Sequence, residues 1–297
     1  MTHSRFALAA LVLGACAGTA AAQEAPATPA FAGQNWRVYE DAEAIQLRDI
    51  AAIVVVRPEN RDDVAISITN PGPLEAPEVR RAGDRLVVDG KLRRRIRSCR
   101  ADGGRFEAEV RDVGRLQNER LPTIEIRAPQ DLALTASGAV RLHVGRAESL
   151  DVRVEGCGDA DLEGASGDVD VVVAGAQTLR LYQANEASIR VAGAGEVTLG
   201  AVRAGLDASI AGSGELVAAH VDGPTNIAVQ GAGDVTIRGG RATEMSVLIA
   251  GAGDVSHLGS AESLDVVIVG GGDVRVARVS GEVNRRVIGG GDITVGR

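Results

Sequence analysis

The amino-acid sequence predicts an all-β protein, a parallel β-solenoid whose coils are about 19 residues long. Three observations predict this fold. A glycine-rich turn recurs at a nearly constant interval, apolar residues alternate around each turn, and aromatic residues make up only 2% of the 297 residues. A narrow core of stacked aliphatic side chains suits such a composition, so we expect few large pockets.

The repeated turn has the sequence Gly-x-Gly-Asp or Gly-x-Gly-Glu, and it begins at residues 156, 193, 212, 231, 251, 270 and 289. A degenerate copy, Gly175-Ala176-Gln177-Thr178, fills the one gap, so that successive starts differ by 18 to 20 residues. Spacing this regular indicates a stack of coils. The repeated turn residues are Gly156, Gly158, Asp159, Gly193, Gly195, Glu196, Gly212, Gly214, Glu215, Gly231, Gly233, Asp234, Gly251, Gly253, Asp254, Gly270, Gly272, Asp273, Gly289, Gly291 and Asp292.

Apolar residues alternate on both sides of each turn, as in Leu264, Val266 and Ile268 before Gly270. Alternation places one parity on one face of a strand, and here the inward parity continues through the turn. A single coil cannot bury this face, but stacked coils bury one continuous interior. Arg285 falls on the inward parity, which predicts that the last coil bulges or opens to solvent.

The seven acidic turn residues would form one file along the stack, which allows two interpretations. They could bridge cations, or each Asp could accept local backbone N–H bonds while the glycines permit the sharp corner. We favour the second, because the calcium-binding repeats that use a similar vocabulary recur every nine residues. His143, His220 and His257 fall on different coils, and no phosphate loop, dinucleotide fingerprint or Gly-x-Ser-x-Gly elbow is suitably placed. We therefore expect no metal, no cofactor and no catalytic residue.

The N-terminus predicts export. Arg5 precedes an apolar stretch, and Ala20 to Ala22 form a cleavage site, so residues 1–22 are expected to be a signal peptide. Leu13 to Cys16 also resemble a lipobox, and lipidation of Cys16 is the alternative to cleavage after Ala22. Residues 23–45 are expected to be a flexible Pro/Ala-rich linker, and residues 46–297 a single solenoid domain. Its early strands are expected at 50–56, 64–68, 86–88 and 124–126.

An irregular segment at about residues 90–120 carries the basic run from Lys91 to Arg100 and one of the two cysteines of the domain. Cys99 and Cys157 are expected to form a disulfide that clips this segment over a turn, the alternative being two free thiols. The net charge of −8 argues against nucleic acid as a partner. The basic run is expected to be a solvated surface, although contact with a polyanion is the alternative.

The signal segment, the early strands and the Gly-Ala-Gly-Asp-Val turns together resemble the putative auto-transporter adhesin head GIN domain family, over roughly residues 50–297. The resemblance implies a right-handed parallel β-helix without recognised catalytic residues, and a role in adhesion.

Two functional classes follow from these features. The first is a non-catalytic envelope or surface scaffold in the periplasm, or at the outer membrane or cell surface, that binds an envelope protein or glycan. The alternative is a carbohydrate-active β-helix enzyme, lyase-like or hydrolase-like, which a groove with clustered carboxylates beside Arg or Lys would favour. Membrane contact is expected only through a lipid anchor. The unpaired strand edges at the end of the stack also suggest an end-to-end homodimer.

Overall fold

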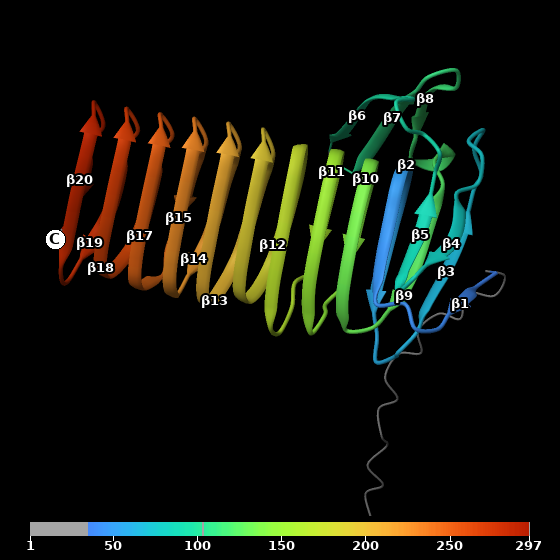
Figure 1. Cartoon of the computed structure of the whole chain (residues 1–297), viewed down its shortest axis with the longest axis horizontal. Helices are drawn as coiled ribbons and strands as arrows, with labels where there is room; N and C mark the ends of the chain where they lie inside the picture. Colours follow the sequence, from blue (N-terminus) through green and yellow to red (C-terminus); the bar gives the residue numbers. More distant parts are fainter. Residues whose placement is uncertain (1–34, 103, 297) are drawn as a thin grey trace, which may run out of the picture. The chain divides into compact units, whose positions relative to one another are not determined.

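The computed structural model describes residues 35–102 and 104–296, which form one unit. The signal segment, Cys16 and residues 23–34 lie outside this description. The predicted fold class is confirmed, because the chain forms a β-solenoid of about 9 turns with a spacing of about 19 residues (Figure 1). None of the helices in the described part of the chain is long and apolar enough to cross a membrane.

Each regular coil contributes one strand segment before the glycine turn and one after it, and both segments pair in parallel with the neighbouring coils. We name the two resulting ladders A, before the turn, and B, after it. Ladder A includes residues 206–212, 225–231 and 264–270, and ladder B includes 196–202 and 215–221. The solenoid strands are β10 (Asp131–Val144), β11 (Ser149–Leu162), β12 (Asp168–Gly193), β13 (Glu196–Gly212), β14 (Glu215–Val221), β15 (Gly223–Gly231), β16 (Asp234–Ile237), β17 (Arg241–Gly251), β18 (Val255–Gly270), β19 (Val274–Val279), β20 (Val283–Gly289) and β21 (Ile293–Val295).

Glycine is required at the corners because each first glycine stacks directly on the one in the preceding coil. Gly270 has φ of 138°, and a Cβ atom there would lie 2.0 Å from the carbonyl oxygen of Gly251. The next residue, Gly271, has open space, since a Cβ atom there would meet nothing within 4 Å. This contrast explains why the middle position of the turn varies among Ala, Ser, Cys and Gly while the first does not.

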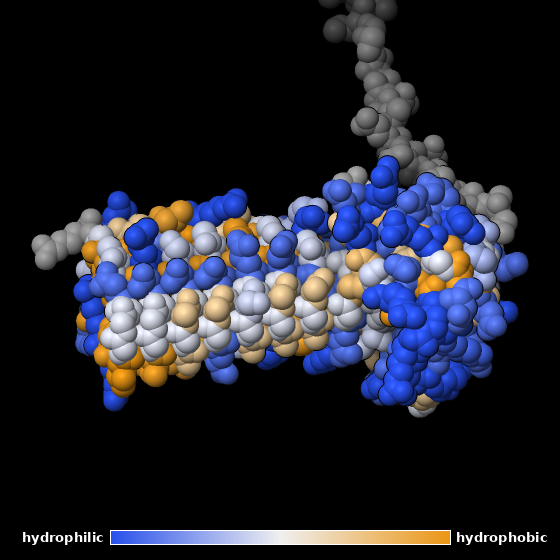
Figure 2. Space-filling view, turned by 90° about the horizontal axis from the view of Figure 1, so that it is seen from above, coloured by the Kyte–Doolittle hydropathy of each residue, from blue (hydrophilic) through white to orange (hydrophobic). Residues whose placement is uncertain are grey.

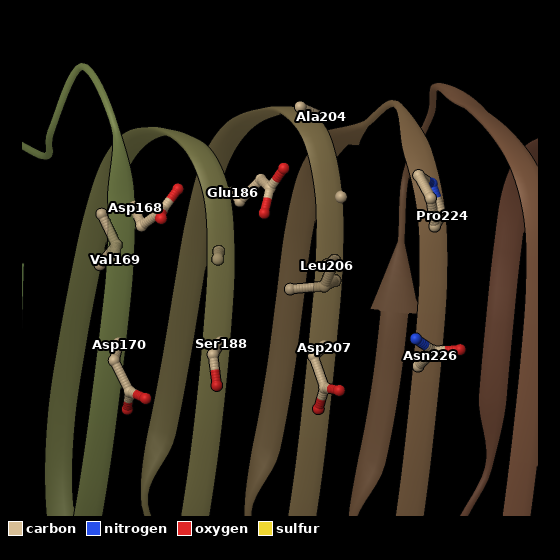
Figure 3. Close-up of a pocket in the computed structure, with 12 residues that line it drawn as sticks. Asp168, Val169, Asp170, Glu186, Ser188, Ala204, Leu206, Asp207, Pro224 and Asn226 are labelled. Carbon is tan, nitrogen blue, oxygen red and sulfur yellow. The ribbon is translucent and has the colours of Figure 1, made fainter.

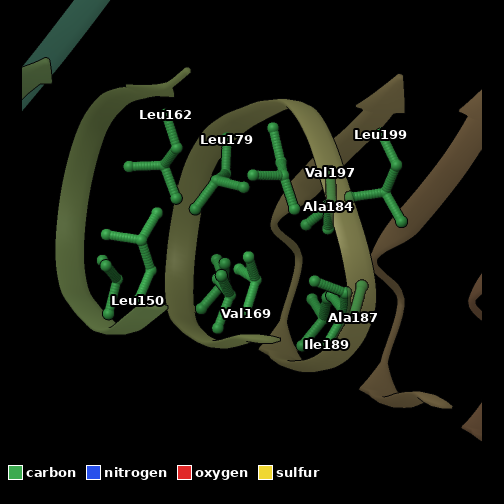
Figure 4. Close-up of a cluster of buried hydrophobic side chains, with 14 of the residues drawn as sticks. Leu150, Leu162, Val169, Leu179, Ala184, Ala187, Ile189, Val197 and Leu199 are labelled. Atoms are coloured by element: carbon green, nitrogen blue, oxygen red, sulfur yellow. The ribbon is translucent and has the colours of Figure 1, made fainter. Parts of the chain in front are cut away.

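The solenoid interior is a continuous column of Val, Leu, Ile and Ala side chains. Figure 4 shows Leu150, Val169, Leu179 and Ile189 turned toward the inside of their coils, and all four are buried. Each such side chain contributes roughly 1.5–3 kcal/mol before conformational entropy is subtracted. Arg285 pairs in register with the buried Val266 yet is itself exposed, so the last coil opens to solvent without a break in its register.

The N-terminal end of the stack is closed by additional strands. Both ladders continue from β10 to β2 and then to β5 and β9, after which antiparallel strands finish the sheet. Strand β1 pairs with β3, so residues 35–45, expected to belong to a flexible linker, are structured, and the ordered unit includes residues before 46. These strands are β1 (Arg37–Tyr39), β2 (Ala44–Pro58), β3 (Val64–Thr69), β4 (Glu78–Ala82), β5 (Arg85–Asp89) and β9 (Thr123–Ala128).

The segment expected to be irregular folds instead as a small antiparallel sheet with its own core. It contains β6 (Ile96–Asp102), β7 (Arg105–Val110) and β8 (Gly114–Gln117), followed by the short 3-10 helix η1 (Asn118–Arg120). Phe106, Ala108 and Val110 alternate inward along β7 and are buried against Ala51 and Ala139 of the solenoid. The alternation of apolar residues in β7 therefore gives this strand one buried face, as alternation does in the coils.

Candidate binding surfaces

The acidic turn file is held by hydrogen bonds to the backbone. The Oδ1 atoms of Asp234, Asp254 and Asp273 each accept the backbone N–H of the Asp in the next coil, over 2.8–2.9 Å. In the Glu coils the backbone bonds differently, since the N–H groups of Glu215 and Asp234 donate to glycine carbonyls of the preceding coil. The Asp side chains accept backbone N–H groups as expected, but from the next coil instead of from their own turn, so they link neighbouring coils.

Asp159, the first member of this file, is almost buried and forms an ion pair with Arg141 at 3.1 Å. Among the residues described, no group of three or more His, Cys, Asp or Glu side chains is arranged to hold a metal ion.

The histidines lie apart, as their positions in the sequence predict. His143 faces Glu163 at 3.5 Å and His220 faces Asp222 at 3.1 Å, both at the surface. His257 is buried in the inward column of ladder B, where its Nε2 lies 3.1 Å from the carbonyl oxygen of Ser260. Burial lowers the pKa of His257, and the bond to Ser260 opposes this shift without cancelling it. The neutral ring is therefore favoured in the fold.

The structure joins Cys99 of β6 to Cys157 in the first glycine turn by a disulfide, as the sequence suggests. Arg141 of ladder B also binds the same small sheet, because its guanidinium donates to the backbone carbonyls of Gly104 and Arg105. Its carbon atom Cζ also lies 5.7 Å from the centre of the Phe106 ring. These links hold the β6–β7 hairpin over the outer surface of ladder B.

The basic run from Lys91 to Arg100 lies beside and along β6. Lys91 forms an ion pair with Glu78 at 2.7 Å, and Arg95 donates to the carbonyl of Arg111. Arg93, Arg94, Arg97 and Arg100 are exposed, as expected for a solvated surface. Figure 2 shows that hydrophilic residues gather at this end of the unit, whereas a white and light tan stripe of residues with intermediate hydropathy runs along the coils.

A hollow of about 390 Å³ lies on the outer surface of ladder A, across several coils (Figure 3). Asp170, Ser188, Asp207 and Asn226 follow one another along it, and Asp170 is paired with Arg190 at 2.9 Å. These four belong to a longer outward row, here named the polar column, in which every member is Asp, Ser or Asn. Its members are Asp151, Asp170, Ser188, Asp207, Asn226, Ser246, Asp265 and Asn284.

A groove of about 440 Å³ lies between the β6–β7 hairpin and ladder B. The hairpin forms its wall and three consecutive coils form its floor. We name it the hairpin groove; its lining residues are Ala101, Asp102, Gly104, Arg141, Asp159, Asp161, Thr178, Arg180 and Tyr182. Carboxylates and arginines are clustered here, but Asp159 is paired with Arg141 and Asp161 with Arg180, at 3.1 and 3.2 Å.

Sequence reasoning identified neither the polar column nor the hairpin groove. The column carries a signal that could have been found, because it occupies the same outward parity in each coil before the turn. The sequence gives a weaker signal for the hairpin groove, because the residues of its wall and its floor are far apart in the sequence. Tyr182 alone was noticeable, as an aromatic residue next to the inward Leu181 in a chain with few aromatic residues.

Comparison with known proteins supports the fold and the family. The model of the family described as putative auto-transporter adhesin, head GIN domain, matches residues 78–220, from β4 to β14. The predicted resemblance is thereby confirmed. No curated protein matches the chain in sequence.

Several solved structures share the architecture. A putative lipid binding protein from Parabacteroides distasonis has a TM-score of 0.61 at 18% identity, covering 90% of this chain and 98% of its own. A putative adhesin from the same species has a TM-score of 0.53 at 15% identity, covering 88% and 95%. A putative adhesin from Parabacteroides merdae has a TM-score of 0.52 at 17% identity, covering 90% and 98%. At these identities the likeness shows the fold alone.

Proposed function

We propose that this protein is a non-catalytic binding module of the bacterial envelope or cell surface, and that it holds an extended ligand along the outer surface of its coils. The polar column carries this proposal. Its short hydrogen-bonding side chains repeat at the spacing of neighbouring strands, about 4.8 Å. A row of equivalent groups at a fixed interval fits a ligand that is itself extended and rich in hydrogen-bond donors, as a glycan or an extended peptide is.

The column is available for binding at its centre. Ser188, Asp207 and Asn226 have no side-chain hydrogen-bond partner within residues 35–102 and 104–296; Asp207 and Asn226 are exposed, and Ser188 is half-buried at the edge of the hollow. Polar groups without internal partners are satisfied by water, which a ligand can replace. The adhesin family and the adhesin-like structures agree with an exported surface or envelope protein that binds a partner.

The enzyme alternative is favoured by one observation, the carboxylates and arginines of the hairpin groove. We give it less weight because Asp159 and Asp161 are already engaged by Arg141 and Arg180. A glycosidase needs one carboxyl group to act as an acid and a second to act as a base or nucleophile. Carboxylates that are paired with guanidinium groups are poorly suited to the role of the acid.

Cosedimentation with peptidoglycan sacculi and with an outer-membrane fraction tests the proposal, combined with mass spectrometry of the supernatant. The full-length exported protein should sediment with at least one of these and release no glycan fragments. The triple variant Ser188→Ala, Asp207→Ala, Asn226→Ala should lose most of this binding. A matched control, Thr198→Ala, Thr236→Ala, Ser256→Ala, removes short polar side chains from ladder B instead. Equal loss in both variants, or released fragments, would contradict the proposal.

A further inference from the structure

Tyr182 is the one exposed aromatic side chain in the described part of the chain, with 57% of its surface accessible. It lies at the floor of the hairpin groove. The positions beside it in the next two coils are Gly200 and Ala219, which are too small to cover the ring. No hydrogen bond within the described residues occupies its hydroxyl group. A large apolar ring is therefore left open beside polar groups, which is the usual composition of a ligand site.

The charges around the ring are nearly balanced. Arg141 is paired with Asp159 and also holds the hairpin wall, so this ion pair shapes the groove. Arg180 and Asp161 are paired at 3.2 Å but remain partly exposed, with 47% and 33% of their side chains accessible. Asp102 and Thr178 have no side-chain partner among the described residues. The groove therefore offers both donors and acceptors, and it has no excess of positive charge that would attract an anion.

We propose that the hairpin groove is a subsite for a neutral sugar residue, which stacks on Tyr182. The C–H face of a pyranose ring is apolar and its edge carries hydroxyl groups. The ring of Tyr182 would contact the face, while carboxylate oxygens accept from the hydroxyls and the free N–H groups of Arg180 donate to them. The groove contains three carboxylates and two guanidinium groups, so a negative charge on the sugar would not strengthen binding. The volume of about 440 Å³ is in the range of small-ligand sites.

This inference rests on the proposed function in treating the solenoid as a binding module, but it concerns a different surface, on ladder B. It also gives the disulfide a role beyond stability. Cys99 and Arg141 hold the hairpin that forms the groove wall, so the site exists only when the small sheet is docked.

Affinity electrophoresis tests the subsite, with the full-length exported protein in native gels that contain dextran, mannan, xylan or polygalacturonate. At least one of the three neutral polymers should slow the protein, and polygalacturonate should not slow it more. Tyr182→Ala should raise the dissociation constant about tenfold, because stacking on the ring is lost. Tyr182→Phe should stay close to the wild type, since the ring remains. Leu258→Ala is the matched control, because Leu258 is a similarly exposed apolar residue, at 53%, of ladder B outside the groove.

Two results would overturn the subsite. One is the failure of all three neutral polymers to slow the wild-type protein, and the other is retardation that Tyr182→Ala leaves unchanged. Neither result touches the polar column, whose own test is cosedimentation with the Ser188, Asp207 and Asn226 variant. Circular dichroism should show that Tyr182→Ala folds normally, as expected for a side chain that is mostly exposed.

Discussion

The regular coils and the head are built in different ways. In the coils, residues 196–296, every strand pairs with its equivalent in a neighbouring repeat, and the turns supply the corner glycines. In the head, residues 35–128, partners are far apart in the sequence. Strand β2 pairs with β9 and β10, and the backbone N–H of Asp49 donates to Oγ of Ser137. The head also contains a second core and one half of the disulfide.

The two parts therefore obtain their stability from different contacts. A coil is stabilised by its two neighbours, so a defect should spread only locally. The head is stabilised by tertiary links that the repeat does not supply, so loss of one link should release a whole sheet. The two ends differ for the same reason. The N-terminal edge is covered by β3, β5 and β9, whereas Val287 and Ile288 in the last coil are 41% and 52% exposed.

The largest effect is expected from Gly270→Ala in the coils. The alanine would have to adopt the positive φ of Gly270, and its Cβ atom would overlap the carbonyl oxygen of Gly251. The free energy of unfolding should fall by about 4 kcal/mol. Gly271→Ala, one residue later, should change it by less than about 0.5 kcal/mol. Urea denaturation measures both, and hydrogen exchange should place the damage in the coils next to Gly270. Equal effects of the two substitutions would break the stacked-corner explanation.

The next largest effect is expected in the head, from removal of the disulfide. The double variant Cys99→Ser, Cys157→Ser opens a loop with a sequence separation of 58 residues. The free energy of unfolding should fall by about 3 kcal/mol. Hydrogen exchange should accelerate across β6, β7 and β8 and remain slow in β18, because the coils do not depend on the head. Reduction of the wild-type protein with dithiothreitol should reproduce the result. Faster exchange throughout the solenoid would contradict the division into two regions.

The same division explains how far the sequence could predict the structure. Wherever the Gly-x-Gly turn recurs, its spacing correctly predicted the coils. The coil at Gly138 was missed, although this glycine stacks under Gly156, because its turn retains only the first glycine. In the head, the pairing of β6 with β7 follows a local pattern, but its docking depends on Cys99 and Arg141. The hairpin groove could not be predicted, since no local pattern connects Asp102 with Tyr182.

A smaller effect is expected from the Asp ladder of the coils. Asp254→Ala removes the oxygen that accepts the backbone N–H of Asp273, so stability should fall by about 1 kcal/mol. Asp254→Asn keeps an oxygen at this position and should stay close to the wild type. Glu215→Ala is the control within the same file, because the N–H of Asp234 in the next coil donates to Gly214 instead. Thermal unfolding of the three variants measures the differences. An equal loss for Glu215→Ala would show that the carboxylates act through charge.

The smallest effect concerns His257, the one buried titratable side chain of the coils at residues 196–296. Its pKa is lowered from 6.5 by burial, and backbone hydrogen bonds to the ring oppose this shift only in part. Below pH 6.5 the unfolded chain therefore takes up a proton that the folded chain resists. Stability should fall as the pH is lowered from 6.5 to the depressed pKa, and this loss should level off below it. His257→Leu, between Ile237 and Val276 in the column, should abolish this dependence above pH 5, where most carboxyl groups remain ionised in both states. Thermal unfolding between pH 5 and 8 measures this dependence of stability on pH.

If the stability of His257→Leu fell with pH as steeply as that of the wild type, while the exposed His220→Leu removed the fall, the titrating group would lie at the surface. The interior of the coils would then be insensitive to pH.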